Sequence, residues 1–203
     1  MDLYPSFKLK DRLGAGGVLL LVLFYFLTII MVFLPALGAV VVEIMDRPRN
    51  IPAITIGDTN SQKHIIMVYH PGASDFTSEV MKLLAGTLAE AGYSITLNSV
   101  QAKLRLNMDE AAAVGMASPV YAGTIRPPLE KFIMNNDFTG KRCFLILTGS
   151  DPHNAEKDTL KASSLIEDRG GTVVDKVKLI MQKDREQVHQ QIEQFGKNLA
   201  EKL

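Results

Sequence analysis

The sequence contains a long stretch without any charged side chain. No Asp, Glu, Lys, Arg or His occurs between Arg12 and Glu43, and Leu, Val, Phe, Ile and Ala dominate this stretch. A helix that crosses a membrane needs about 20 apolar residues, so residues 17–42 are long enough for one transmembrane helix. Pro35 lies inside it, where local rearrangement and water can satisfy the freed carbonyl. The sequence therefore predicts a membrane anchor.

A cleaved signal peptide is the alternative to an anchor. The small residues Ala36, Gly38 and Ala39 suit a signal peptidase. The apolar stretch is, however, longer than the core of a signal peptide, which has about 7–15 residues, and this favours an uncleaved single-pass anchor. Three Lys or Arg residues precede the span and two follow it closely. By the positive-inside rule this small difference favours a cytoplasmic N-terminus.

The part after the anchor is large enough for one domain with its own core, at about 160 residues. We expect a flank at 1–16, the helix at 17–42, a tether at 43–62 and a domain at 63–203. The net charge of zero argues against a nucleic-acid partner. Cys143 is the only cysteine, which excludes an intramolecular disulfide and a Cys-rich zinc site. The four histidines show no metal-ligand spacing.

The domain alternates apolar strand patterns with amphipathic helix patterns. Strands are expected at 64–69, 94–97, 111–117, 143–147 and 172–180, and helices near 80–91, 127–133, 154–168 and 188–199. Such alternation predicts an α/β fold with a doubly wound, five-stranded parallel sheet. Ligands of these sheets bind beyond the carboxyl ends of the strands. The loops of interest are therefore 70–77, 118–126 and 148–154.

The first of these loops carries hydroxyl groups at the start of a helix. Ser74 and Thr77 beside free backbone N–H groups suit a phosphate. Ordinary helix capping by Ser74, Asp75 or Thr77 is the alternative.

The second loop holds an aromatic side chain in a turn. Pro119 and Gly123 flank Tyr121, which can stack on a planar ligand or pack against the neighbouring helix. Periodicity does not decide between these two roles. Cys143 is predicted to be a core residue. His70 and His153 are predicted to be solvated side chains at the rim of the loops. Lys176 and Lys178 are predicted to belong to a solvated face.

Three segments of the domain resemble the flavodoxin family. Residues 114–123 (VGMASPVYAG), together with the helix start at 127–133 (PPLEKFI), look like its central segment. Residues 140–149 resemble its next strand and flavin-contacting loop, and residues 65–80 stand where the family carries its phosphate loop. The resemblance implies a flavodoxin-like fold and FMN as cofactor.

The resemblance also implies which residues hold FMN. The phosphate would lie against the first loop and the ring between the other two, with no catalytic acid or base and no metal. The first loop departs from the family's usual Thr-Gly-x-Thr, since it reads Ala73-Ser74-Asp75-Phe76-Thr77. The implied cofactor-binding residues are His70, Gly72, Ser74, Asp75 and Thr77 for the phosphate, and Ser118, Pro119, Tyr121, Ala122, Gly123, Thr148, Gly149, Ser150 and Asp151 for the ring.

These observations lead to one main functional expectation and one alternative. The main expectation is a membrane-anchored, flavodoxin-like redox protein that binds FMN and exchanges electrons with a membrane-associated partner protein. Because flavin loading and nicotinamide-linked donors are cytoplasmic, the resemblance favours a cytoplasmic domain, against the small charge difference. The alternative is a non-redox interaction or regulatory module that has lost FMN binding, and the atypical Asp75 loop motivates it. No nucleophile–base pair that would favour a hydrolase is evident.

Overall fold

The computed structural model describes residues 9–47, 51–101, 104, 106–182 and 184–203. The chain divides into two compact units, Met1–Met45 and Asp46–Leu203. Residues 1–8 of the expected flank and residues 48–50 of the expected tether lie outside the described residues.

The described residues of the N-terminal unit form one helix, α1 (Leu9–Asp46), which contains Pro35. Its segment Gly16–Gly38 is long and apolar enough to cross a membrane, and none of this segment is buried. Phe24, Met31 and Leu34 each leave 68–70% of their surface exposed. Such a continuous apolar surface is unusual for a protein in water. The helix extends beyond the predicted span 17–42, because the charged residues on both sides also favour helix.

The second unit is built on a seven-stranded sheet in the order β1-β3-β2-β4-β6-β7, with β5 paired to β4. Five of these strands are parallel, which confirms the predicted α/β architecture. In spatial order they are β3 (Ser94–Ser99), β2 (His64–Tyr69), β4 (Ala111–Tyr121), β6 (Arg142–Gly149) and β7 (Thr172–Ile180).

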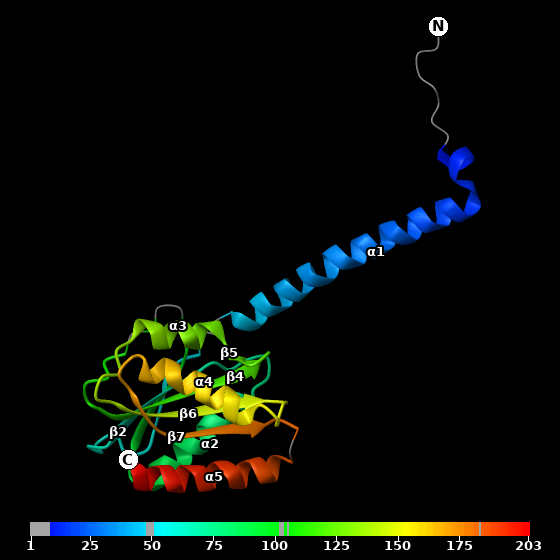
Figure 1. Cartoon of the computed structure of the whole chain (residues 1–203). Coiled ribbons are helices and arrows are strands. Elements are labelled where there is room, and N and C mark those ends of the chain that lie inside the picture. Colours follow the sequence, from blue (N-terminus) through cyan, green and yellow to red (C-terminus); the bar gives the residue numbers. More distant parts are fainter. Residues whose placement is uncertain (1–8, 48–50, 102–103, 105, 183) are drawn as a thin grey trace. The chain divides into compact units, whose positions relative to one another are not determined.

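Helices cover both faces of this sheet (Figure 1). The helices α2 (Phe76–Glu90) and α5 (Arg185–Lys202) pack on one face, where their apolar stripes meet Ile65, Ile95 and Phe144. The helices α3 (Pro127–Asn135) and α4 (Ala155–Glu167) pack on the other, over Val114 and Leu145. Both faces of the central strands are therefore buried, which explains their nearly continuous apolar sequences.

The strand order reverses between β2 and β4. From β2 the chain moves outward to β3, and it then returns to β4 on the other side of β2. Helices that follow strands on opposite sides of this point leave a crevice at the carboxyl edge of the sheet. The loops at 70–77 and 122–123 and the end of β6 all lie at this edge, so the fold brings the three predicted segments together.

A short antiparallel strand, β1 (Ile54–Ile56), extends the sheet beside β3. It lies inside the range 43–62, for which only a tether was predicted. The strand was missed because three residues near Pro and Gly give a weak strand pattern. The backbone N–H of Ile51 donates to Ser99 Oγ (3.3 Å), and this hydroxyl donates to the Ile51 carbonyl (3.2 Å). Because Ser99 ends β3, the chain enters the domain at the carboxyl edge of the sheet.

The third parallel strand is longer than predicted. β4 continues to Tyr121, so Ser118 and Pro119 lie in the strand and not in a loop. At Pro119 the strand pairs with β6 alone, and a missing backbone N–H is tolerated where a strand has one free side. β5 (Thr124–Ile125) then folds back on β4.

The turn between β4 and β5 has two residues, Ala122 and Gly123, with φ of 51° and 73°. Positive φ at both positions is the requirement of a type I′ hairpin. Among the described residues Ala122 is the only one other than glycine with positive φ, a conformation that costs an alanine about 1–2 kcal/mol. The hairpin therefore holds Tyr121 at the carboxyl edge at some cost in stability.

The centre of the sheet is closely packed at Gly115. A Cβ atom at this position would contact the ring atoms Cζ and Cε2 of Phe144 on the neighbouring strand, and would lie 3.1 Å from Met67 Cγ. Both of these side chains are fully buried. The glycine is thus required for the close approach of the Phe144 ring to the backbone of β4.

Candidate functional site

The three predicted segments contact one another at the carboxyl edge. A Cβ atom on Gly72, whose φ is 75°, would lie 2.8 Å from Pro119 Cγ and 3.5 Å from the Tyr121 hydroxyl. The Thr77 and Thr148 hydroxyl oxygens are 2.8 Å apart in a buried hydrogen bond. The loop after β2 is therefore fixed to the ends of both β4 and β6.

The loop after β2 is partly buried. His70 was expected at a solvated rim but is only 1% exposed, and its Nδ1 accepts a hydrogen bond from the backbone N–H of Gly72 (3.0 Å). The Thr77 hydroxyl is directed at Thr148, so of the two predicted hydroxyls only that of Ser74 lies at the surface. Asp75 occupies the N-cap position of α2, but its side chain makes no capping hydrogen bond.

The ring of Tyr121 is half-buried beside a cation. The guanidinium carbon of Arg126, the residue at the start of α3, lies 4.8 Å from the ring centroid. Such a cation–π contact fixes the plane of the ring. The ring also borders an open cavity, so Tyr121 both packs near the helix start and remains accessible. Tyr121 thus partly fulfils both predicted roles, since it packs near the start of the neighbouring helix and is also accessible to a planar ligand.

A cavity of about 570 Å³ lies between the β4–β5 hairpin and α4. This volume is within the range of small-molecule sites, about 300–1,000 Å³. Five of its lining residues were predicted from sequence, and the phosphate-loop residues 70–77 do not line it. The cavity is lined by Val120, Tyr121, Ala122, Gly123, Ser150, Asp151, Asn154, Lys157, Asp158, Lys161 and Lys178.

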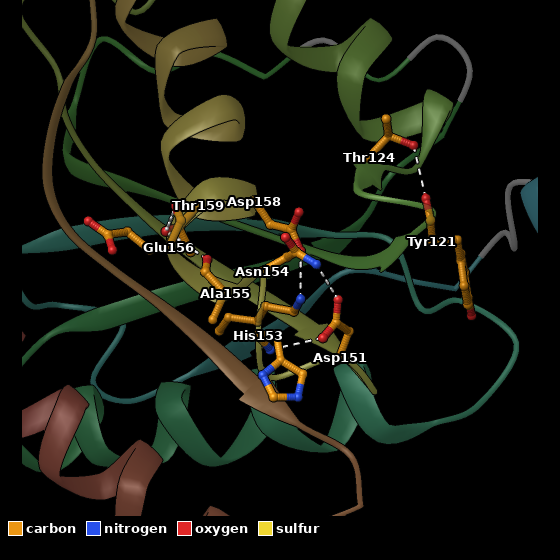
Figure 2. Close-up of polar contacts among 10 residues, drawn as sticks. Tyr121, Thr124, Asp151, His153, Asn154, Ala155, Glu156, Asp158 and Thr159 are labelled. Carbon is orange, nitrogen blue, oxygen red and sulfur yellow. Dashed lines mark hydrogen bonds and ion pairs between the residues drawn. The ribbon is translucent and has the colours of Figure 1, made fainter.

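A tight turn of the chain precedes α4 at one end of the cavity. The Asp151 carboxylate accepts hydrogen bonds from the Asn154 side-chain amide (2.6 Å) and from the backbone N–H of His153 (2.9 Å), as Figure 2 shows. These two bonds, the Asn154 bond first, lower the pKa of Asp151. His153 itself is exposed, as expected.

Replacing Asn154 by alanine should raise the pKa of Asp151 toward its ordinary value. A carboxyl with a lowered pKa in the folded state adds stability above its unfolded pKa, and this contribution is lost as the pH falls through the folded pKa. In the variant this contribution to stability should therefore be smaller, and what remains of it should be lost at a higher pH. Carbon-13 NMR of the carboxyl groups during a pH titration measures the change. Asp137 serves as the control, because its pKa is lowered by hydrogen bonds that Thr139 donates to it and should not change in the variant.

A buried ion pair lies beside the hairpin. Lys178 Nζ of β7 and Asp158 Oδ2 of α4 are 2.5 Å apart, and their side chains are 2% and 5% exposed. Figure 2 shows Asp158 on the first turn of α4, on the side of the Asp151 turn. The assignment of Lys178 to a solvated face was wrong, because β7 turns this side chain toward α4. Lys176 also reaches α4, through Ser163 Oγ (3.2 Å).

The pairing of Asp158 with Lys178 was missed, because only a weak sequence signal pointed to it. They are twenty positions apart, in patterns that resemble solvated charges. The one available indication that Lys178 faces a helix is that Lys176 and Lys178 lie on the same face of a strand.

The only cysteine is buried within β6. Burial raises the pKa of the Cys143 thiol to about 12. Cys143 is therefore a core side chain, as predicted, and is not a nucleophile at neutral pH.

Comparison with solved structures relates this domain to proteins of known fold. Flavodoxin 1 from Bacillus cereus superposes with a TM-score of 0.59 and 16% identity, over 70% of this chain and 99% of the flavodoxin. The domain has a flavodoxin-like fold. A flavodoxin-like protein from Agrobacterium tumefaciens (TM-score 0.54, 18% identity) matches 68% of this chain and 96% of its own. An NADH:FMN oxidoreductase (TM-score 0.55, 16% identity) matches 70% of this chain and 90% of its own.

These likenesses cover the flavodoxin-like domain at low sequence identity. No protein-family model matches the sequence, and no curated protein matches it either. The shared property is therefore the fold, and the function must be argued from the residues at its carboxyl edge.

Proposed function

We propose that the protein is a membrane-anchored redox protein that binds FMN in the crevice of its flavodoxin-like domain. The observation that supports this most directly is the cavity of about 570 Å³ at the carboxyl edge, with Tyr121 in its wall. An accessible aromatic ring beside a cavity of this size suits a planar heterocycle. FMN would supply the one- and two-electron chemistry.

The residues of the chain would position the cofactor. Tyr121, fixed by Arg126, would stack on the flavin ring, and Ser150 and Asp151 would border its other side. The loop at 70–77 would hold the phosphate through its backbone and the Ser74 hydroxyl. These groups fit the ring better than the phosphate, because the Thr77 hydroxyl bonds to Thr148.

The N-terminal helix supports a partner that is itself associated with a membrane. An anchored protein meets such a partner in two dimensions, which raises its effective concentration. The chain enters the domain at Ile51, on the same edge as the crevice. Because flavin loading is cytoplasmic, we place the domain on the cytoplasmic side of a single-pass anchor.

A spectrum of the purified full-length protein tests this proposal. The protein should carry stoichiometric FMN with flavin absorbance that bleaches on reduction. Tyr121→Ala should bind FMN roughly tenfold more weakly, because stacking on an aromatic side chain contributes about 1–3 kcal/mol. Tyr121→Phe retains the ring and should bind nearly as well as the wild type. A colourless protein that takes up no added FMN would rule the proposal out.

The second candidate is a membrane-tethered interaction or regulatory module without flavin. The observation that favours it is the loop at 70–77, where Asp75 adds a negative charge near the expected phosphate. On this hypothesis Tyr121→Ala leaves function intact, and changes on the outer helices abolish partner capture. Stoichiometric FMN in the native protein would contradict it.

A further inference from the structure

The α4 side of the cavity carries two lysines that the proposed FMN site does not use. Lys157 and Lys161 lie one turn apart on the same helix face and both line the cavity. We propose that this side of the cavity binds the phosphate or carboxylate group of a small soluble molecule, separately from the cofactor.

The charges around the cavity leave these two lysines available for an anion. Lys178, the third lysine, is neutralised by Asp158 at 2.5 Å. The Asp151 carboxylate is held by Asn154 and by the His153 backbone. Within the part of the chain that the structure describes, neither Lys157 nor Lys161 has a carboxylate within 4.0 Å. Three lysines and two aspartates line the cavity, which leaves an excess of positive charge.

The geometry makes an anion favourable at this place. Like charges at positions i and i+4 of a helix repel each other weakly, and an oxyanion between the two ammonium groups would replace this repulsion with two attractions. Both lysines are exposed, so the attraction depends on two ammonium groups acting on one anion and is weakened by salt. The buried Lys178–Asp158 pair keeps the cavity wall in place beside them.

The position separates this group from the phosphate of FMN. The loop at 70–77, which would hold the cofactor phosphate, contributes no residue to the cavity. Lys161 lies about 10 Å along α4 from Asn154, at a rise of about 1.5 Å per residue. The cavity therefore extends along α4, away from the turn of Asp151, and a substrate anion could lie there next to a flavin ring that contacts Tyr121.

Phosphate binding to the full chain tests the inference. Inorganic phosphate is titrated into protein in maltoside micelles, which carry no phosphate, against chloride at equal ionic strength, and binding is followed by calorimetry. Lys157→Gln/Lys161→Gln should raise the dissociation constant at least roughly fivefold. Lys82→Gln/Lys131→Gln removes the same charge from exposed positions on α2 and α3 and should change it less than about twofold.

The results separate this inference from the proposed function. Equal phosphate affinity in the Lys157/Lys161 variant and the wild type would overturn the inference, and so would the absence of binding at about 20 mM phosphate. Mutual exclusion of FMN and phosphate would also overturn it, since the cofactor's own phosphate would then occupy the cavity. A protein that binds phosphate through these lysines but takes up no FMN would support the inference while refuting the proposed function. Thermal unfolding without phosphate verifies that each variant is folded.

Discussion

Asp158→Ala is expected to lower the free energy of unfolding by about 3–5 kcal/mol, because it leaves the Lys178 ammonium buried without its counter-charge. The side chain of Lys178 is 2% exposed, so its ammonium group has little contact with water to compensate for the lost carboxylate. Urea unfolding of the full chain in micelles, followed by circular dichroism, measures the change.

Two controls distinguish a stranded charge from a general loss of packing. Asp158→Leu/Lys178→Met removes both charges and should be within about 1 kcal/mol of the wild type, since an apolar pair of similar size can replace a buried ion pair. Asp175→Ala breaks the pair of Asp175 with Lys202, which is more exposed, and should cost less than about 1 kcal/mol. A double variant that is as unstable as Asp158→Ala would show that the charge of Lys178 is not the cause.

Gly115→Ala is expected to destabilise the domain by about 3 kcal/mol, because the new methyl group would overlap the ring of Phe144. Neither the backbone of β4 nor the ring of Phe144 has room to move, since β4 pairs with a strand on each side at this position and Phe144 is fully buried. The free energy of unfolding in urea measures the effect.

A second substitution shows whether the overlap is responsible. Gly115→Ala/Phe144→Leu removes the ring edge, so its loss in free energy of unfolding should be smaller than the sum of the losses of the two single variants. Gly86→Ala in α2 is the matched control, because a Cβ atom there meets nothing within 4 Å. It should raise the stability by about 0.5–1 kcal/mol. Strict additivity of the Gly115 and Phe144 substitutions would contradict the proposed contact.

The regular elements could be predicted because their patterns are long. The strand at 172–180 matches β7, and the helix at 154–168 differs from α4 by one residue at each end. Shorter elements failed for physical reasons. β1 has three residues and obtains its stability from pairing with β3, which is distant in the sequence. The extension of β4 past Ser118 was missed because Pro119 normally indicates a loop, whereas here one side of the strand is free.

The candidate site was predictable only as far as topology determines it. The reversal of strand order places the loops of Thr77, Tyr121 and Asp151 at one edge, and the structure brings these segments together. Their detailed contacts were not predictable, since the Thr77–Thr148 bond joins side chains 71 positions apart. The lysines of the cavity were missed because an exposed lysine and a ligand-facing lysine on a helix have the same sequence pattern.

The burial of Cys143 makes the chain suited to chemical mapping in intact cells. Maleimides react with thiolates, and the only native thiol is enclosed in β6 with its pKa raised to about 12. A cysteine placed at the exposed Glu193 would thus be the single labelled site in the molecule. A maleimide that does not cross membranes, applied before and after the cells are opened, would then report directly which compartment contains the domain.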